Sequence, residues 1–347
     1  MKRSLQIALR VAGCLVLLAV TLEVCARTED TVRYGAPFFG NYSMTSLVET
    51  DAVGKHGRPH SSYLKWHLNA EGYRGPELRD GEYRIACVGS SETFGLYESP
   101  EMEWPRQLES LLNAGQLGRP FEVVNTGFAG MSVGTSLKRL PEMLATVRPQ
   151  MVVVYPSYTA YIRHAPPPPD KFEPRMVDRV RVLLKKAVPQ PLVARVQTWQ
   201  LRLSGSDAKA MDRLPEEAVE AFRSDLDAMV TQLQARGVRV VLVTHANRFG
   251  KTVLPAERSV MESWRKFYPA LKEGGFLDME QRMSDVMRAE GAARGVPVVD
   301  AAEEIAPGPK DFAEFVHFTD AGARAMALLV AAEVERERGG AEFPPPR

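Results

Sequence analysis

Two segments far apart in the chain carry the side chains that acyl-group chemistry needs. Ser91 follows a short apolar run, residues 85–88, and a glycine, Gly89. His317 lies near the other end of the chain, three residues after Glu314. A serine attacks an acyl carbon when a histidine takes its proton and a carboxylate holds the tautomer of that histidine. These spacings predict a catalytic triad of Ser91 as nucleophile, His317 as base and Glu314 as orienting acid.

The surroundings of these residues support the same chemistry and leave one alternative open. Open α/β folds place reactive groups just beyond the carboxyl ends of parallel strands, so the Ser91 hydroxyl is expected at the mouth of a sheet. Asp320 is expected to cap an alanine-rich helix that begins there. Asp311, six residues before His317, is the rival orienting acid.

At these positions the chain resembles the SGNH, or GDSL-type, esterase family. The family's Gly-Asp-Ser motif corresponds to residues 89–95, and its Asn followed by Gly five residues later corresponds to Asn125 and Gly130. Its Asp-x-x-His motif corresponds to residues 314–317. The resemblance covers most of residues 82–336. It implies a serine esterase in which the backbone N–H groups of Ser91 and Gly130 form the oxyanion hole.

Three departures from the family pattern bear on activity. Ser90 and Glu314 stand where the family usually has Asp, and the Gly-x-Asn-Asp motif is absent after residue 155. Thr159 is nearest to the missing Asn, which implies that Thr159, Ser157 or a backbone N–H supplies the third oxyanion donor. Losing one such donor costs roughly a hundred- to a thousandfold in turnover. Two alternatives to an esterase therefore remain: an acyltransferase acting on an extracellular polysaccharide, and a catalytically impaired binding module.

Composition limits the classes of partner. The formal net charge of +1 gives no global argument for nucleic acid binding. Three cysteines do not suggest a disulfide framework, and no Cys pair has zinc-ligand spacing. We therefore expect no metal and no cofactor. The expected partners are a small-molecule or glycan acyl ester and a membrane.

The membrane is implied by residues 1–26. Lys2 and Arg3 precede an apolar stretch whose uninterrupted run covers residues 11–22. This segment is either an uncleaved signal anchor or a signal peptide cut near residue 26. We favour the anchor, because Glu23 lies close to that cut. Either interpretation places the catalytic domain outside the cytoplasm, on a single-pass membrane protein or on a secreted or periplasmic one.

The rest of the chain divides by composition. Residues 27–81 read as a tether and pre-domain segment, residues 82–338 as the hydrolase-like domain, and residues 339–347 as a tail. An insertion at about residues 160–216 contains four consecutive prolines, and residues 175–202 hold seven basic residues against one acidic residue. This basic segment is either a solvated surface insertion or an amphipathic helix that covers the site or a membrane surface.

Within the main domain, strands alternate with helices. Strands are predicted over residues 83–88, 121–125, 151–155, 238–244 and 296–299. Helices are predicted over residues 103–113, 132–146, 217–236, 281–294 and 320–336. Strands separated by helices pair in parallel through right-handed crossovers. The predicted fold is a three-layer α/β/α sandwich around a flavodoxin-like parallel sheet.

Overall fold

The structure is a computed structural model, and it describes residues 2–34, 38–39, 44–80, 82–114, 120–162, 210–268 and 270–339. The chain divides into two compact units. The first consists of residues 1–46, 62–65 and 166–204. The second consists of residues 47–61, 66–165 and 205–347. Each unit is described by itself.

The described part of the first unit is dominated by one long helix, α1 (Lys2–Tyr34). Its stretch Leu5–Glu29 is 25 residues long and, by length and composition, sufficient to cross a membrane; about 20 apolar residues are needed. A signal sequence passes the same test. Near the end of this stretch, Arg27 donates a 2.7 Å hydrogen bond to Glu23. The chain thus has an N-terminal apolar helix that is a signal sequence or an anchor.

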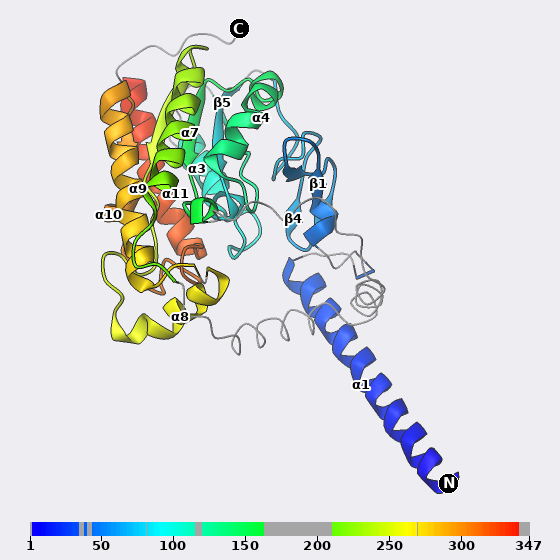
Figure 1. The fold of residues 1–347 in the computed structure, drawn as a ribbon. Helices are drawn as coiled ribbons and strands as arrows, with labels where there is room; N and C mark the ends of the chain where they lie inside the picture. The colour runs from blue at the N-terminus through cyan, green and yellow to red at the C-terminus, as the bar shows by residue number, and fades with distance from the viewer. Residues whose placement is uncertain are drawn as a thin grey trace. The chain divides into compact units, whose positions relative to one another are not determined.

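The second unit is built on a sheet of five parallel strands in the order β6-β5-β7-β8-β9 (Figure 1). The strands are β5 (Tyr83–Gly89), β6 (Phe121–Asn125), β7 (Met151–Tyr155), β8 (Arg239–Val243) and β9 (Val298–Val299). Every residue of β5, β6 and β7 is buried. Buried parallel strands read as continuous apolar runs, which is why the sequence predicted them.

Helices cover both faces of this sheet (Figure 1). On one face, α3 (Trp104–Ala114) and α11 (Asp320–Gly339) pack over side chains such as Ile85 and Cys87. On the other, α4 (Val133–Thr146), α7 (Glu216–Gln234) and α9 (Glu273–Arg294) pack over Ala86 and Val88. Successive strand residues point to opposite faces, so one strand supplies both cores. The predicted three-layer α/β fold is confirmed.

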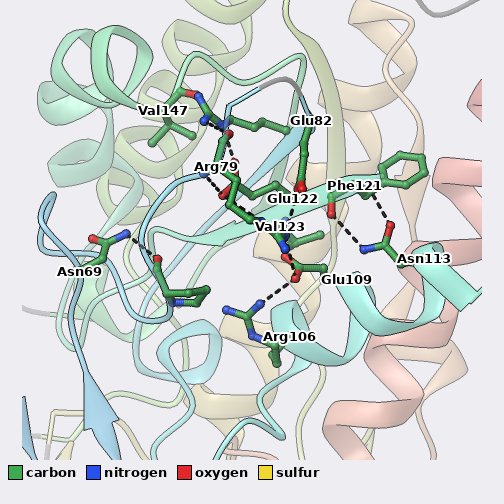
Figure 2. Close-up of polar contacts among 12 residues, drawn as sticks. Asn69, Arg79, Glu82, Arg106, Glu109, Asn113, Phe121, Glu122, Val123 and Val147 are labelled. Atoms are coloured by element: carbon green, nitrogen blue, oxygen red, sulfur yellow. Dashed lines mark hydrogen bonds and ion pairs between the residues drawn. The ribbon is translucent and has the colours of Figure 1, made fainter. Parts of the chain in front are cut away.

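Side chains of α3 cover the open edge of β6. Glu109 accepts a 2.8 Å hydrogen bond from the backbone N–H of Val123, and Asn113 bonds to both backbone groups of Phe121. Figure 2 shows these contacts, with Arg106 also donating to Glu109 at 2.8 Å. An uncovered edge strand presents unpaired N–H and C=O groups to other chains. Here a helix satisfies them.

Several elements differ from the sequence-based expectation. Within residues 27–80, expected to be irregular, α1 continues to Tyr34 and β1 (Val48–Thr50) pairs antiparallel with β2 (Lys55–Gly57). Helix α9 begins at Glu273, eight residues before the predicted start at 281. The remaining elements are η1 (Met44–Leu47), β3 (Ser62–Tyr63), β4 (Trp66–His67), α2 (Ser91–Phe94), η2 (Thr159–Ile162), η3 (Pro255–Glu257), α8 (Arg258–Phe267) and α10 (Ala301–Glu304). The basic segment at 175–202 lies outside the described residues.

Candidate active site

Ser91 lies where the sequence placed it, at the start of α2 and directly after β5. The turn between them is tight: a Cβ added to Gly89 would come 2.6 Å from the carbonyl oxygen of Tyr155. Only glycine fits so close an approach. The Ser91 side chain is half-buried, and its hydroxyl donates a 3.2 Å hydrogen bond to Oε2 of Glu92.

The end of α2 is held by a buried arginine that the sequence did not single out. A helix of four residues leaves its last carbonyls without partners in the helix. Nη1 of Arg74 donates to the carbonyls of Phe94 and Gly95, and its Nη2 lies 2.8 Å from Oε2 of Glu103. The sequence placed the residues around Arg74 only in the tether and pre-domain segment, residues 27–81. They hold the nucleophile turn in place.

His317 and Glu314 are in direct contact. Oε1 of Glu314 accepts hydrogen bonds from the backbone N–H of His317, at 3.2 Å, and from its ring Nδ1. The His317 ring is partly exposed, but its Nε2 atom is buried and has no hydrogen-bond partner among the described residues. A carboxylate on one ring nitrogen and an available second nitrogen is the arrangement of a general base.

Contacts between the two ends of the domain bring the His317 loop to the nucleophile loop. The backbone N–H of Ser99 donates a 2.7 Å hydrogen bond to Oδ1 of Asp320, and the Tyr97 ring lies 5.4 Å from that of His317. The expectation that Asp320 caps α11 is wrong: Thr319 Oγ1 accepts from the backbone N–H of Gly322. Asp320 is instead used to join the segments.

Ser91 and His317 are not hydrogen-bonded to each other in this structure. The Ser91 hydroxyl is directed to Glu92, and no described residue hydrogen-bonds to Nε2 of His317. Catalytic hydrogen bonds are often long or misaligned without substrate and tighten in the complex. The Ser99–Asp320 and Tyr97–His317 contacts bring the two segments together, but the Ser91 hydroxyl bonds to Glu92 and not to His317.

The predicted oxyanion donors lie after the strands on either side of β5. Gly130, after β6, has a φ of +86° and donates its N–H to Oγ of Ser90 at 3.2 Å. Thr159, after β7, is half-buried, and its hydroxyl lies 3.1 Å from that of Ser157. Tyr158, between those two residues, is fully buried in the core. The Ser90 hydroxyl is thus the acceptor for the Gly130 N–H in this structure.

Sequence reasoning missed a buried cluster beside the nucleophile. Nδ1 of His245 lies 2.8 Å from Oε2 of Glu280, and its Nε2 lies 3.4 Å from Oε1 of Glu92. His245 is fully buried, two residues beyond the end of β8, and its ring stacks on that of Tyr155 at 5.5 Å. A glutamate directly after the nucleophile, in a turn that must pack against the sheet, was the available signal.

The charges around the two histidines set their protonation. Burial lowers the pKa of His245, but Glu280 and Glu92 outweigh it and hold this pKa well above its ordinary value. Burial likewise opposes charge on His317, and its hydrogen bond to Glu314 together with nearby carboxylates raises its pKa. The described residues contain no group of three or more His, Cys, Asp and Glu arranged to hold a metal ion.

The chain is similar in sequence and in structure to known proteins. The sequence model of the GDSL-like lipase/acylhydrolase family matches residues 87–325. The lipase/acylhydrolase from Enterococcus faecalis shares 17% identity over 73% of this chain and 96% of its own, with a TM-score of 0.44. The psychrotrophic esterase EstA from Pseudoalteromonas sp. shares 10% identity over 74% of this chain and 100% of its own, with a TM-score of 0.45. No curated protein sequence matched the chain.

Proposed function

The chain belongs to the GDSL-like lipase/acylhydrolase family, whose members are hydrolases acting on ester bonds, and from this premise we propose that it is an exported serine esterase anchored by α1. Ser91 is the nucleophile, His317 the general base and Glu314 the residue that orients His317. The observation that carries this proposal is the His317 ring, with Nδ1 on Glu314 and a buried Nε2 that lacks a hydrogen-bond partner among the described residues.

The reaction begins when an ester carbonyl enters beside Ser91. The serine Oγ–H bond breaks as its proton moves to Nε2 of His317, and Oγ forms a bond to the acyl carbon. The carbonyl oxygen becomes an oxyanion. His317 then gives the proton to the leaving alcohol, and a water activated by the same ring releases the acyl group and frees Ser91.

Three donors are proposed for the oxyanion: the backbone N–H groups of Ser91 and Gly130 and the hydroxyl of Thr159. The Gly130 N–H now donates to the Ser90 hydroxyl at 3.2 Å, and the oxyanion would replace that hydroxyl as the acceptor. Thr159 accepts from Ser157 and donates to the oxyanion, which the 3.1 Å separation of their hydroxyls allows. A fixed set of donors stabilises charge that develops only in the transition state.

The test of this site uses the full-length protein in detergent with short-chain nitrophenyl esters and a fluorophosphonate probe. We expect ester hydrolysis and a covalent adduct on Ser91, both lost in Ser91→Ala. Ser90→Ala is the matched control, because it removes the neighbouring hydroxyl and should retain labelling. Labelling that persists in Ser91→Ala would overturn the nucleophile assignment. Transfer of acetyl from a donor ester to a polysaccharide faster than to water would replace hydrolase by transferase.

The anchor rests on the charges at the two ends of α1. Lys2, Arg3 and Arg10 lie at the N-terminal end, and positive charge is retained on the cytoplasmic side. At the other end the Glu23–Arg27 hydrogen bond lets the two charges neutralise each other. We expect the protein to stay with membranes after alkaline extraction, with an intact N-terminus by mass. A soluble protein beginning near residue 26 would show instead that the segment is a cleaved signal.

A further inference from the structure

A continuous chain of polar contacts runs from the nucleophile turn to α9. The Ser91 hydroxyl donates to Oε2 of Glu92 at 3.2 Å, and the other oxygen of Glu92 lies 3.4 Å from Nε2 of His245. On its far side, Nδ1 of His245 lies 2.8 Å from Glu280. Asn247 adds a 3.5 Å hydrogen bond to the same Glu280 oxygen. Apart from Ser91, none of these residues is a member of the proposed triad.

The three charged residues in this series of contacts are buried to a degree that is unusual for charged groups. Glu92 is 2% exposed, His245 0% and Glu280 5%. A buried carboxylate stays ionised only when a cation or hydrogen-bond donors offset its lost hydration. The single imidazolium of His245 serves two carboxylates, so the three groups together carry one net negative charge. That charge is next to the hydroxyl of Ser91, which donates a hydrogen bond to Glu92.

Packing alone does not account for Glu92. Its neighbour in the turn, Phe94, is 1% exposed and fills the core with apolar surface. An apolar residue at position 92 would fill its site without the cost of desolvating a carboxylate, and replacing buried ion pairs by apolar residues is often neutral or stabilising. The charge at position 92, one residue after Ser91, therefore needs an explanation other than packing.

We propose that Glu92, held ionised by His245, is a positioning residue for the reaction: it holds the Ser91 hydroxyl before substrate binds and stabilises the imidazolium of His317 after the proton has moved. This inference rests on the proposed esterase function. When Oγ of Ser91 gives its proton to Nε2 of His317, a positive charge appears on a ring that Glu314 contacts and on which Glu92 also acts electrostatically. Both carboxylates favour that charge, one by a hydrogen bond and the other through space.

Other titratable groups face the same ring and must be counted. Glu92 and Glu98 both act electrostatically on His317, and Tyr97 lies against its ring. Glu92 in turn faces His245 after β8, His317 before α11 and Tyr155 at the end of β7. Glu280 acts from α9 through His245. Of these groups, Glu92 alone also contacts the nucleophile, which is why it is the residue to change.

The test is Glu92→Gln in the full-length protein, with the pKa of His317 measured by NMR titration of its ring C–H signal, assigned with His317→Gln. We expect this pKa to fall by about one unit, as loss of a nearby opposite charge predicts. The acid limb of kcat/KM against pH should move to lower pH by the same amount. The plateau of kcat should fall about tenfold as the imidazolium loses stabilisation, since each 1.4 kcal/mol is a factor of ten. Glu101 is an exposed carboxylate on the same loop, and Glu101→Gln should leave the pKa of His317, the acid limb and kcat unchanged.

Two outcomes overturn the proposal: a His317 titration unchanged in folded Glu92→Gln, or an acid limb that does not move. If Glu92→Gln fails to fold, Glu280→Gln removes the charge on the far side of His245. It should lower the pKa of His317 by a smaller amount. An unchanged titration there is equally contradictory. The NMR titration reads His317 directly, so it separates this inference from the esterase proposal, which fails if the wild-type Ser91 is not labelled.

Discussion

Two histidines at the carboxyl edge of the sheet show how similar contacts produce different chemistry. Each has Nδ1 against a glutamate: Glu280 for His245 and Glu314 for His317. His245 is fully buried, and its second nitrogen faces another carboxylate, Glu92, at 3.4 Å. His317 is partly exposed, and among the described residues its second nitrogen has no hydrogen-bond partner.

The difference lies in what each ring can still do. His245 has a carboxylate at both nitrogens, so it is held as a fixed cation and cannot exchange its proton during a reaction. His317 has one nitrogen free to receive a proton and a carboxylate ready to stabilise the charge that results. We therefore expect loss of His317 to affect mainly catalysis, and loss of His245 to affect mainly stability, with the smaller loss of turnover expected when Glu92 is no longer held ionised. Four substitutions test this contrast.

The largest effect is expected for His317→Gln. Without the base, the proton of Ser91 has no acceptor, and removal of a triad histidine costs roughly 10^4-fold or more in turnover. The free energy of unfolding should change by less than about 1 kcal/mol, because the side chain is partly exposed. Ester assays and urea denaturation measure the two quantities on one preparation. Activity within tenfold of wild type would remove His317 from the mechanism.

His245→Gln should show the reverse pattern. It leaves Glu92 and Glu280 buried without their shared cation, and breaking a buried ion pair costs about 3–5 kcal/mol. Urea denaturation should show that loss. The variant that also carries Glu92→Gln and Glu280→Gln should recover part of it, because the unpaired charges are gone. A His245→Gln protein as stable as wild type would show that the cluster does not contribute to folding.

Glu98→Gln tests the surroundings of His317 through the pH dependence of stability, because Glu98 acts electrostatically on that ring. Burial raises the pKa of Glu98 from 4.5 to about 7. Below pH 4.5 the carboxyl is protonated in both states; between pH 4.5 and 7 the unfolded chain ionises while the folded protein keeps its proton. Wild-type stability therefore falls as pH rises through that window, by up to about 3 kcal/mol.

The substitution removes this titration, so the stability of Glu98→Gln relative to wild type should increase between pH 5 and pH 8 by about 2–3 kcal/mol. Urea denaturation at the two pH values measures it. Glu101→Gln, whose side chain is 70% exposed, is the control and should show no such trend. A difference that stays constant with pH would contradict the pKa assigned to Glu98.

Thr159→Val removes one proposed oxyanion donor while keeping the side-chain shape. It should lower kcat about a hundredfold and leave the titration of both histidines unchanged. Ser157→Ala, which removes only the hydroxyl that bonds to Thr159, should cost less. Full activity in Thr159→Val would move the third donor to another group.

The contrast also explains what the sequence could and could not predict. The Glu314–His317 contact is local, spaced by three residues in one turn, so the pattern of residues was sufficient to propose it. The Glu92–His245–Glu280 cluster joins a turn after β5, a loop after β8 and the face of α9, and no local pattern links them. The four longer strands were predictable because most of their residues are apolar, although Arg84 interrupts β5 and Glu122 interrupts β6. Helix α9 was predicted too short, since Gly274 and Gly275 in its first turn weaken the helical signal.

Asp320 has a consequence for when this protein gains its activity. Its contact with Ser99 spans 221 positions of the sequence. A growing chain that has reached residue 300 already holds Ser91 and Gly130, yet it has neither His317 nor the hydrogen bond that brings the histidine's segment to the nucleophile. A partly synthesised chain therefore lacks the proposed general base and is inactive. If the domain is exported as it is made, ester cleavage starts only after the segment that carries His317 and Asp320 has crossed and folded.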